Sequence, residues 1–393
     1  MSHCEVCSAR ALSVGSLIML QRTAHGWANA TLSPFAHNAT PPALHQWPES
    51  MSCKPRFMII GSPKCGSTSL FKYLEAHPDV RQPRQKELCY FSTFKRYLTR
   101  YRPSHVTDWQ QYVAGFAGSN GLGMVRPTRR RGRNLKRARR LLEQLVGIPR
   151  TVLADACRAG RTVAFEGCPF YLHEHLAASQ IFATFPQLRA VAVLRNPRER
   201  SVSAFNDYVR MRRIRAASSS TGRGAQMQAM VEKKIQMLRS GARALEDFDL
   251  RILTSGVYIY GLREWGRVWP ARQLLVVQSE DMFDDAEAAV HRVLDFVGLR
   301  RAIPAEVFKR VHNRNPLSDK AHASAELNRI LDTFFAPYNE QFYGWMEERS
   351  MPYKRWPNGS ATVASGAASS SSSWGNGTHR RHLSTARRGH RAA

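Results

Sequence analysis

The chain has 393 residues, and 43% of them are hydrophobic, which excludes a chain too polar to fold and suffices for one large α/β domain or two smaller ones. Its 58 lysines and arginines against 30 aspartates and glutamates give a formal charge of +28. This excess favours an anionic partner such as a nucleotide, an acidic lipid, a nucleic acid or an acidic polysaccharide, and charge alone does not choose among them.

The first 53 residues are predicted to be a targeting or stem segment. Arg10 precedes "ALSVGSLIML", an apolar run over residues 11–20 that is too short to span a bilayer but suffices for a signal-peptide core or a degenerate membrane anchor. Four glycosylation acceptor motifs favour the secretory pathway, and they begin at Asn29, Asn38, Asn358 and Asn376. Cys4 and Cys7 form a C-x-x-C pair without a second pair, which is weak evidence for a metal site.

The stretch "RFMIIGSPKCGSTSLFKYL" begins at Arg56 and predicts a strand, a glycine-rich turn and a helix. Residues 57–60 are wholly apolar, as in a strand that is buried on both faces of a parallel sheet. Leu70, Phe71 and Leu74 form a helical stripe that stops before His77-Pro78. Unpaired N–H groups at the start of this helix make the turn a candidate cradle for an anion.

The lysine of this turn is in the wrong place for a nucleoside triphosphatase. Such a loop has its lysine directly after the second glycine, where this chain has Ser67, and Lys64 lies three residues earlier. The next buried strand, residues 190–194, is followed by Arg195, whereas a triphosphatase needs an aspartate for magnesium. Magnesium-dependent phosphoryl transfer is therefore disfavoured, and no metal is expected.

A second anion site is predicted after that strand, in "LRAVAVLRNPRERSVSAFNDYVR" from Leu188 to Arg210. Asn196-Pro197 can open a helix, with Arg200 and Ser203 in its first turns. Arg195 and Ser203 can then hold one phosphate between a guanidinium and a hydroxyl.

Together these motifs resemble the sulfotransferases that use 3′-phosphoadenosine 5′-phosphosulfate (PAPS). "GSPKCGSTSL" is similar to their 5′-phosphosulfate loop and "LRNPRERSVS" to their 3′-phosphate motif. "KELCYF" and "EGCPFY" resemble the K-E-x-H-F-F and E-K-S-P-x-Y elements of Golgi heparan-sulfate sulfotransferases. Further similar segments are "GVYIYGLREW", "HNRNPLSDK" and "LDTFFAPYNEQFY". The resemblance covers residues 56–348, and the shared order makes it specific.

The resemblance implies that PAPS is the cosubstrate and that an acceptor hydroxyl or amine displaces 3′,5′-adenosine bisphosphate in line at sulfur. Lys64 would neutralise charge on the leaving group, while Arg195 and Ser203 would hold the 3′-phosphate. Arg314 would add a cation over the nucleotide, or would be an exposed loop arginine. The residues expected to bind the 5′ end of the cosubstrate are Ser62, Lys64, Cys65, Gly66, Ser67, Thr68 and Ser69.

The resemblance places the general base on Glu87, from a strand end beside the loop. The alternatives are that Glu87 forms only a surface ion pair with Lys86 or Arg84, or that Glu166 is the base. A base in a dry pocket would have a raised pKa.

The chain also departs from the family pattern. Cys89 replaces the histidine of K-E-x-H-F-F and Gly167 replaces a frequent lysine, which leaves the acceptor open. No cysteine follows Cys168, which excludes a late disulfide of the heparan-sulfate N-sulfotransferase type. Trp265 and Trp269 have the helical spacing of core residues rather than adenine platforms. His173 and His175 flank a predicted helix start, could face solvent and match no motif position, so neither is assigned a role as ligand or base.

The predicted fold is a P-loop-like α/β sandwich in three layers, with a central parallel sheet of four or five strands near residues 56, 86, 162, 189 and 273. The sulfotransferase domain is expected over 54–350, with an Arg-rich insertion over 119–145 and a disordered tail over 351–393 that is of low complexity from Pro357 onward. The insertion includes nine basic residues between Arg126 and Arg140.

The insertion favours an anionic glycan as acceptor in the Golgi lumen, with association to the membrane through the N-terminus as an option. A sulfotransferase that acts on protein tyrosine or on a small alcohol is the alternative. A basic nucleic-acid-binding protein without catalysis is disfavoured, because motifs that read or stack bases are absent from the sequence. No nucleic-acid partner is therefore expected.

Overall fold

A computed structural model describes residues 46–47, 53–83, 86–92, 109–116, 162–211, 213–215, 217–242, 250–310, 312 and 320–357. A sheet of five strands lies at its centre, in the order β2-β3-β1-β4-β5, and every neighbouring pair is parallel. The strands are β1 (Pro55–Gly61), β2 (Val80–Arg81), β3 (Val163–Gly167), β4 (Arg189–Leu194) and β5 (Leu274–Gln278). The predicted α/β class and parallel sheet are confirmed.

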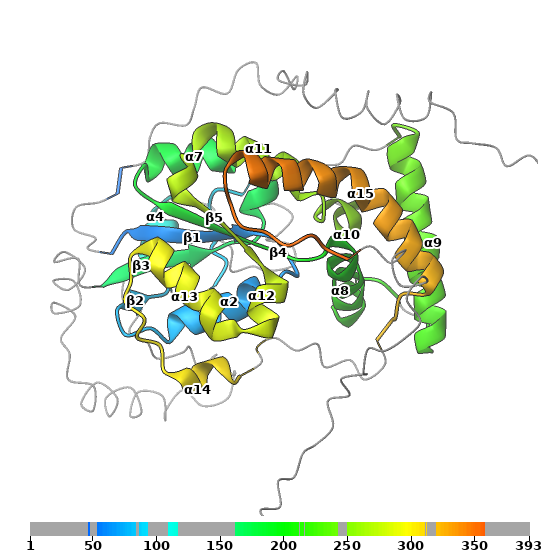
Figure 1. Ribbon diagram of the computed structural model, residues 1–393, viewed down its shortest axis with the longest axis horizontal. Coiled ribbons are helices and arrows are strands. Elements are labelled where there is room, and N and C mark those ends of the chain that lie inside the picture. The colour runs from blue at the N-terminus through cyan, green and yellow to red at the C-terminus, as the bar shows by residue number, and fades with distance from the viewer. Residues whose placement is uncertain are drawn as a thin grey trace, which may run out of the picture. The chain divides into compact units, whose positions relative to one another are not determined.

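Helices cover both faces of the sheet and extend beyond its carboxyl edge (Figure 1). The α-helices are α2 (Ser67–Glu75), α4 (Trp109–Ala114), α7 (Ala177–Thr184), α8 (Pro197–Arg210), α9 (Ser220–Arg239), α10 (Arg251–Thr254), α11 (Tyr258–Val268), α12 (Ser279–Asp284), α13 (Ala286–Val297), α14 (Ala305–Phe308) and α15 (Ala325–Glu348). Two 3₁₀ helices are η1 (Tyr171–His173) and η3 (Ala271–Gln273). In Figure 1, α2 and α13 lie on one face, and α7 and α11 on the other.

The strands are apolar because both faces of the sheet are covered. Met58, Ile59 and Ile60 of β1 are 0% exposed, as are residues 190–194 of β4. Burial on both faces removes the alternation of polar and apolar residues that a half-exposed strand would show. Trp265 and Trp269 are also buried, as predicted for core residues.

The prediction of a strand near residue 86 is wrong. The second strand of the sheet is β2, at residues 80–81, and residues 86–92 form neither helix nor strand. Glu87 and Cys89 have φ angles of 67° and 52°, in the left-handed region that a strand does not use. The apolar side chains in this stretch are buried because the segment packs against the end of β3, not because it pairs with a strand.

The packed domain continues past the predicted boundary at residue 350. Trp356 is only 5% exposed, its ring stacks on Phe342 of α15, and its indole N–H donates to Glu280. Apart from residues 46, 47 and 53, the predicted targeting segment lies outside the described residues, as do the four glycosylation motifs, the run from Arg126 to Arg140 and Arg314. Within the described part of the chain, no helix is long and apolar enough to cross a bilayer.

Candidate active site

The turn after β1 forms a tight crook, which we define as residues 62–66. Lys64 and Gly66 have φ angles of 69° and 84°, so the backbone twice enters the left-handed region. A side chain at Gly66 would also place its Cβ 2.7 Å from Cε of Met282. Glycine is therefore required at this position for both backbone and space, and Lys64 is held in a conformation that costs about 1–3 kcal/mol.

The first turn of α2 follows the crook directly and presents unpaired donors. The cap residue Gly66 makes no side-chain cap, and the first turn contains no acid. In the described structure, the N–H groups of Ser67, Thr68 and Ser69 donate to no protein acceptor. These groups and the positive end of the helix dipole suit a phosphate or a sulfonate. The Ser69 hydroxyl donates to the carbonyl of His312 at 3.3 Å.

Lys64 extends from the crook toward α8. Its Nζ lies 3.3 Å from Oδ1 of Asp207, and both side chains are largely buried. Burial lowers the pKa of the Lys64 ammonium, and Asp207 opposes that shift. A partly desolvated cation of this kind interacts strongly with an anion that enters the site.

Arg195 and Ser203 lie at the same edge of the sheet as the crook. β4 pairs directly with β1, and Arg195 is the residue that follows β4. Pro197 starts α8, capped by the Asn196 side chain, which accepts from the N–H of Arg198. Ser203 lies one turn before Asp207 on α8, and Asp207 contacts Lys64, so the two anion motifs meet.

The guanidinium of Arg195 is partly buried and held loosely. It lies 5.5 Å over the ring of Phe283 and 3.8 Å from Glu199, one turn along α8. Its backbone carbonyl accepts from the Tyr258 hydroxyl at 2.7 Å. The strand end is thus fixed by its backbone, while in the described structure the guanidinium contacts the Phe283 ring and makes a long ion pair with Glu199 that a phosphate can replace.

Ser62 and Cys65 use their side chains inside the protein. The Ser62 hydroxyl donates to the carbonyl of Ser255 at 3.0 Å and lies 2.9 Å from Nε2 of His173. Cys65 is fully buried, and its Sγ lies 3.4 Å from the Tyr258 hydroxyl. Burial raises the pKa of the Cys65 thiol. Both side chains therefore brace the crook.

His173 contacts the crook instead of facing solvent. Because the Ser62 hydroxyl donates its proton to Ser255, Nε2 of His173 is the donor to Ser62. Burial lowers the pKa of His173 well below its ordinary value, and the cations of Arg251 and Arg200 lower it further. The imidazole is therefore neutral at pH 7 and fixes the first residue of the crook. His175 is exposed.

Arg200 ties the crook to the helices behind it. Its side chain is 1% exposed and donates to the carbonyls of Pro63, Arg251 and Ile252. Burial lowers the pKa of this guanidinium. The three carbonyls accept from its Nη groups, Nε has no hydrogen-bond partner in the described structure, and none of the three acceptors is a carboxylate, so Arg200 adds positive potential beneath the crook.

Glu87 is mostly buried and forms an ion pair with Lys86. The pair that was considered as an alternative to the base therefore exists, although it is not a surface pair. Nζ of Lys86 lies 5.9 Å from the ring centre of Phe71 in α2, the helix that begins at the crook. Glu87 thus lies beside α2.

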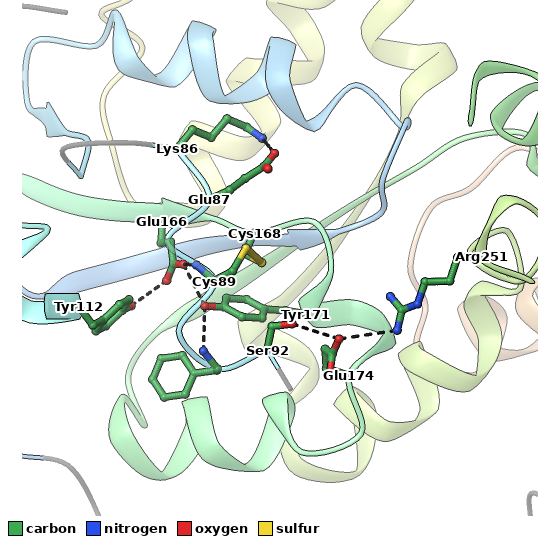
Figure 2. The surroundings of a disulfide bond; sticks show 11 residues. Lys86, Glu87, Cys89, Ser92, Tyr112, Glu166, Cys168, Tyr171, Glu174 and Arg251 are labelled. Atoms are coloured by element: carbon green, nitrogen blue, oxygen red, sulfur yellow. Dashed lines mark hydrogen bonds and ion pairs between the residues drawn. A yellow bond between two sulfur atoms is a disulfide. The ribbon is translucent and has the colours of Figure 1, made fainter. Parts of the chain in front are cut away.

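Glu166 accepts several hydrogen bonds in the core and is a poor candidate for the base. It is 0% exposed, and its oxygens accept from the N–H of Cys89 and from the hydroxyls of Tyr171 and Tyr112. In Figure 2, its carboxylate points toward these tyrosines, whereas Glu87 extends toward Lys86. Burial raises the pKa of Glu166 to about 7, against the effect of its hydrogen bonds.

The raised pKa of Glu166 predicts a pH-dependent stability. The folded state holds this proton more tightly than the unfolded chain, whose pKa is near 4.5, so stability falls as pH rises from about 4.5 to about 7 and levels off above that. Glu166→Gln stays neutral and mimics the protonated acid. Its free energy of unfolding in urea should match the wild type at about pH 4 and exceed it at about pH 8 by up to about 3 kcal/mol. If the free energies of unfolding of the two proteins changed in parallel with pH, the folded state would tolerate the Glu166 carboxylate and the prediction would be wrong.

Three features of the site were missed by the sequence reading. Asp207 lies four residues after Ser203, a helical spacing that could have indicated the same face. The contact of His173 with Ser62 and the disulfide between Cys89 and Cys168 join residues far apart in sequence. Nothing in the local pattern indicates those two pairings.

Three comparisons with known proteins agree with this geometry. The sulfotransferase domain family matches residues 54–329. Heparan sulfate glucosamine 3-O-sulfotransferase 3B1 of Mus musculus is 22% identical over 74% of this chain and 62% of its own length. Carbohydrate sulfotransferase 15 of Rattus norvegicus is 21% identical over 77% of this chain and 55% of its own length. The aligned region thus spans less than two thirds of these relatives.

A solved structure supports the fold separately. The sulfotransferase from Alicyclobacillus acidocaldarius superposes with a TM-score of 0.52 at 20% identity, over 77% of this chain and 98% of that one. The family match covers more than half of the chain, and the fold and order of motifs agree with it. The chain therefore belongs to the sulfotransferase domain family.

Proposed function

We propose that this chain transfers a sulfonate group from PAPS to a hydroxyl or amine of a carbohydrate acceptor. The observation that carries the proposal is the contact between Lys64 and Asp207, 3.3 Å apart, which places the crook against α8. A nucleotide with anionic groups at both ends needs two cationic sites on one edge of the sheet. The carboxyl edge of β1 and β4 offers them.

The two ends of the nucleotide have separate partners in this proposal. The 5′ end binds the N–H groups of Gly66, Ser67, Thr68 and Ser69 together with the ammonium of Lys64. The 3′-phosphate binds Arg195 and Ser203. No metal is needed for this charge neutralisation, since the crook and α8 supply the cations.

The chemistry is an in-line displacement. The acceptor oxygen forms a bond to sulfur while the bond from sulfur to the 5′-phosphate oxygen breaks, and the acceptor proton passes to the carboxylate of Glu87. Lys64 stabilises the charge that develops on the leaving phosphate. The departing nucleotide is 3′,5′-adenosine bisphosphate.

An anionic glycan in the secretory pathway fits the remaining features. The chain has a formal charge of +28, and arginine binds sulfate and carboxylate groups through paired hydrogen bonds. The named relatives act on heparan sulfate or other carbohydrates. The disulfide between Cys89 and Cys168 fits an oxidising compartment such as the Golgi lumen, and Cys53 is also disulfide-bonded.

The test is transfer of label from radiolabelled PAPS to a panel of polysaccharides, tyrosyl peptides and small alcohols, with the Lys64→Ala variant as control. We expect label on anionic polysaccharides from the wild type and little from the variant. Label on tyrosyl peptides alone would select the alternative acceptor class. Absence of transfer to every acceptor, with salt-dependent nucleic-acid binding that Lys64→Ala does not weaken, would contradict the proposed function.

A further inference from the structure

The segment that carries Glu87 is joined by a disulfide and by hydrogen bonds to one other segment of the chain. Residues 86–92 have no regular structure of their own. Their described side-chain hydrogen bonds beyond the segment go to residues 166–174, while the rings of Tyr90 and Phe91 also pack against Tyr112 of α4. Cys89 forms a disulfide with Cys168, with their Cα atoms 5.3 Å apart, and its N–H donates to Oε1 of Glu166 at 2.9 Å. Figure 2 shows these two anchors side by side below Glu87.

Two further anchors fix the end of the segment. The N–H of Phe91 donates to the Tyr171 hydroxyl at 3.3 Å, and the Ser92 hydroxyl donates to Glu174 at 3.2 Å. Glu174 in turn lies 3.7 Å from the guanidinium of Arg251, as Figure 2 shows. We call the anchoring residues the clamp, and all are almost completely buried: Glu166, Cys168, Tyr171 and Glu174.

The clamp is attached to the strands that also support the crook. Glu166 belongs to β3, and the N–H of Cys168 donates to the carbonyl of Ile59 in β1 at 3.0 Å. Gly167 lies between them, and a Cβ there would come 2.9 Å from the ring of Phe71 in α2. The glycine that replaces the family lysine thus allows α2 to pack closely on the clamp.

The conformation of the segment needs such support. Glu87 and Cys89 both have positive φ, which costs about 1–3 kcal/mol for each non-glycine residue. In the described structure, four non-glycine residues have positive φ. Three of them belong to this site: Lys64, Glu87 and Cys89. Hydrogen bonds alone contribute only about 1 kcal/mol each, so a covalent link adds appreciably to the hold on the segment.

We propose that the disulfide between Cys89 and Cys168 is a positioning element for Glu87. It fixes the position of the Glu87 carboxylate relative to the crook, because the crook follows β1 and the clamp follows β3, and these two strands pair with each other. Cys89 and Cys168 therefore act through Glu87 and touch neither cosubstrate nor acceptor. This inference rests on the proposed role of Glu87 as the base.

The test is a double-mutant cycle between the disulfide and Glu87. Cys89→Ala/Cys168→Ala should lower kcat about 10- to 100-fold, the effect of a small misplacement of a reacting group, and leave the Kd of 3′,5′-adenosine bisphosphate unchanged. In a Glu87→Gln background, the same change should lower kcat no further. Val231→Ala in α9, a buried residue far from the disulfide in the fold, controls for lost stability and should keep the wild-type kcat. Cys168→Ser breaks the same bond if the double variant does not fold.

The outcomes separate this inference from the proposed function. An equal loss of kcat in both backgrounds, or full activity of a folded disulfide variant, would overturn the positioning role and leave sulfotransfer intact. Wild-type kcat in Glu87→Gln would overturn it together with the base assignment. Amide hydrogen exchange gives a readout that needs no activity: exchange should accelerate in residues 86–92 and not in α2 when the disulfide is removed. Uniform acceleration, or none, would also overturn the inference.

Discussion

Replacing Lys64 with methionine is expected to lower kcat about 100- to 1000-fold, the usual effect of removing one group that stabilises developing charge. Methionine retains the length and apolar contacts of the stem and removes the ammonium. The Kd of 3′,5′-adenosine bisphosphate should change much less than kcat, because the amides of α2 and Arg195 remain. A loss in kcat that exceeds the loss in binding indicates an interaction made chiefly in the transition state.

The control for this variant is Lys72→Met. Lys72 lies in α2, the helix that follows the crook, is half exposed and pairs with Glu75 on the surface. Exposed pairs contribute about 0–1 kcal/mol, so Lys72→Met should leave both kcat and nucleotide binding near the wild-type values. Steady-state rates and calorimetric titration with 3′,5′-adenosine bisphosphate measure the two quantities. A Lys64→Met protein with normal kcat would exclude the proposed role of the crook.

Asp207 restrains the ammonium of Lys64. The carboxylate lies 3.3 Å from Nζ in the described structure, and it also accepts from Arg210 at 2.6 Å. The ammonium therefore already has a partner at the edge of α8, which limits its conformations. Preorganisation of this kind lowers the cost of placing the charge when the nucleotide binds.

The sequence predicted those parts of the site whose signals are local. The apolar run of β1, the turn residues of the crook and the stripe of α2 lie within 19 consecutive residues, so periodicity and turn residues suffice. Asn196-Pro197 likewise marks the start of α8 by its own chemistry, and the helix begins there. Parallel pairing of the strands then brings the two motifs to one edge.

Tertiary contacts determine the remaining features, and no local pattern encodes them. The segment from 86 to 92 reads as a strand, yet its anchors come from residues 166–174 and turn its backbone into the left-handed region. His173 similarly contacts Ser62, which is 111 positions away. Propensity describes an isolated segment, whereas these conformations are imposed by partners distant in sequence.

Glu87→Gln is the second substitution with a large expected effect. The amide has the same shape and can still accept from Lys86, but it cannot take the acceptor proton. We expect kcat to fall about 100- to 10,000-fold, with the Kd of 3′,5′-adenosine bisphosphate unchanged. The wild-type kcat should also fall at low pH, where a base becomes protonated, and this dependence should vanish in the variant.

Three variants distinguish the candidates for the base. Glu264→Gln removes a carboxylate that pairs with Arg267 near the surface, and it should behave as wild type. Glu166→Gln removes the buried charge next to the disulfide. If Glu87→Gln remained fully active and Glu166→Gln were inactive, the base would be Glu166. The three hydrogen bonds that Glu166 accepts within the core argue against that result, because a base must reach the acceptor and Glu166 has no exposed surface.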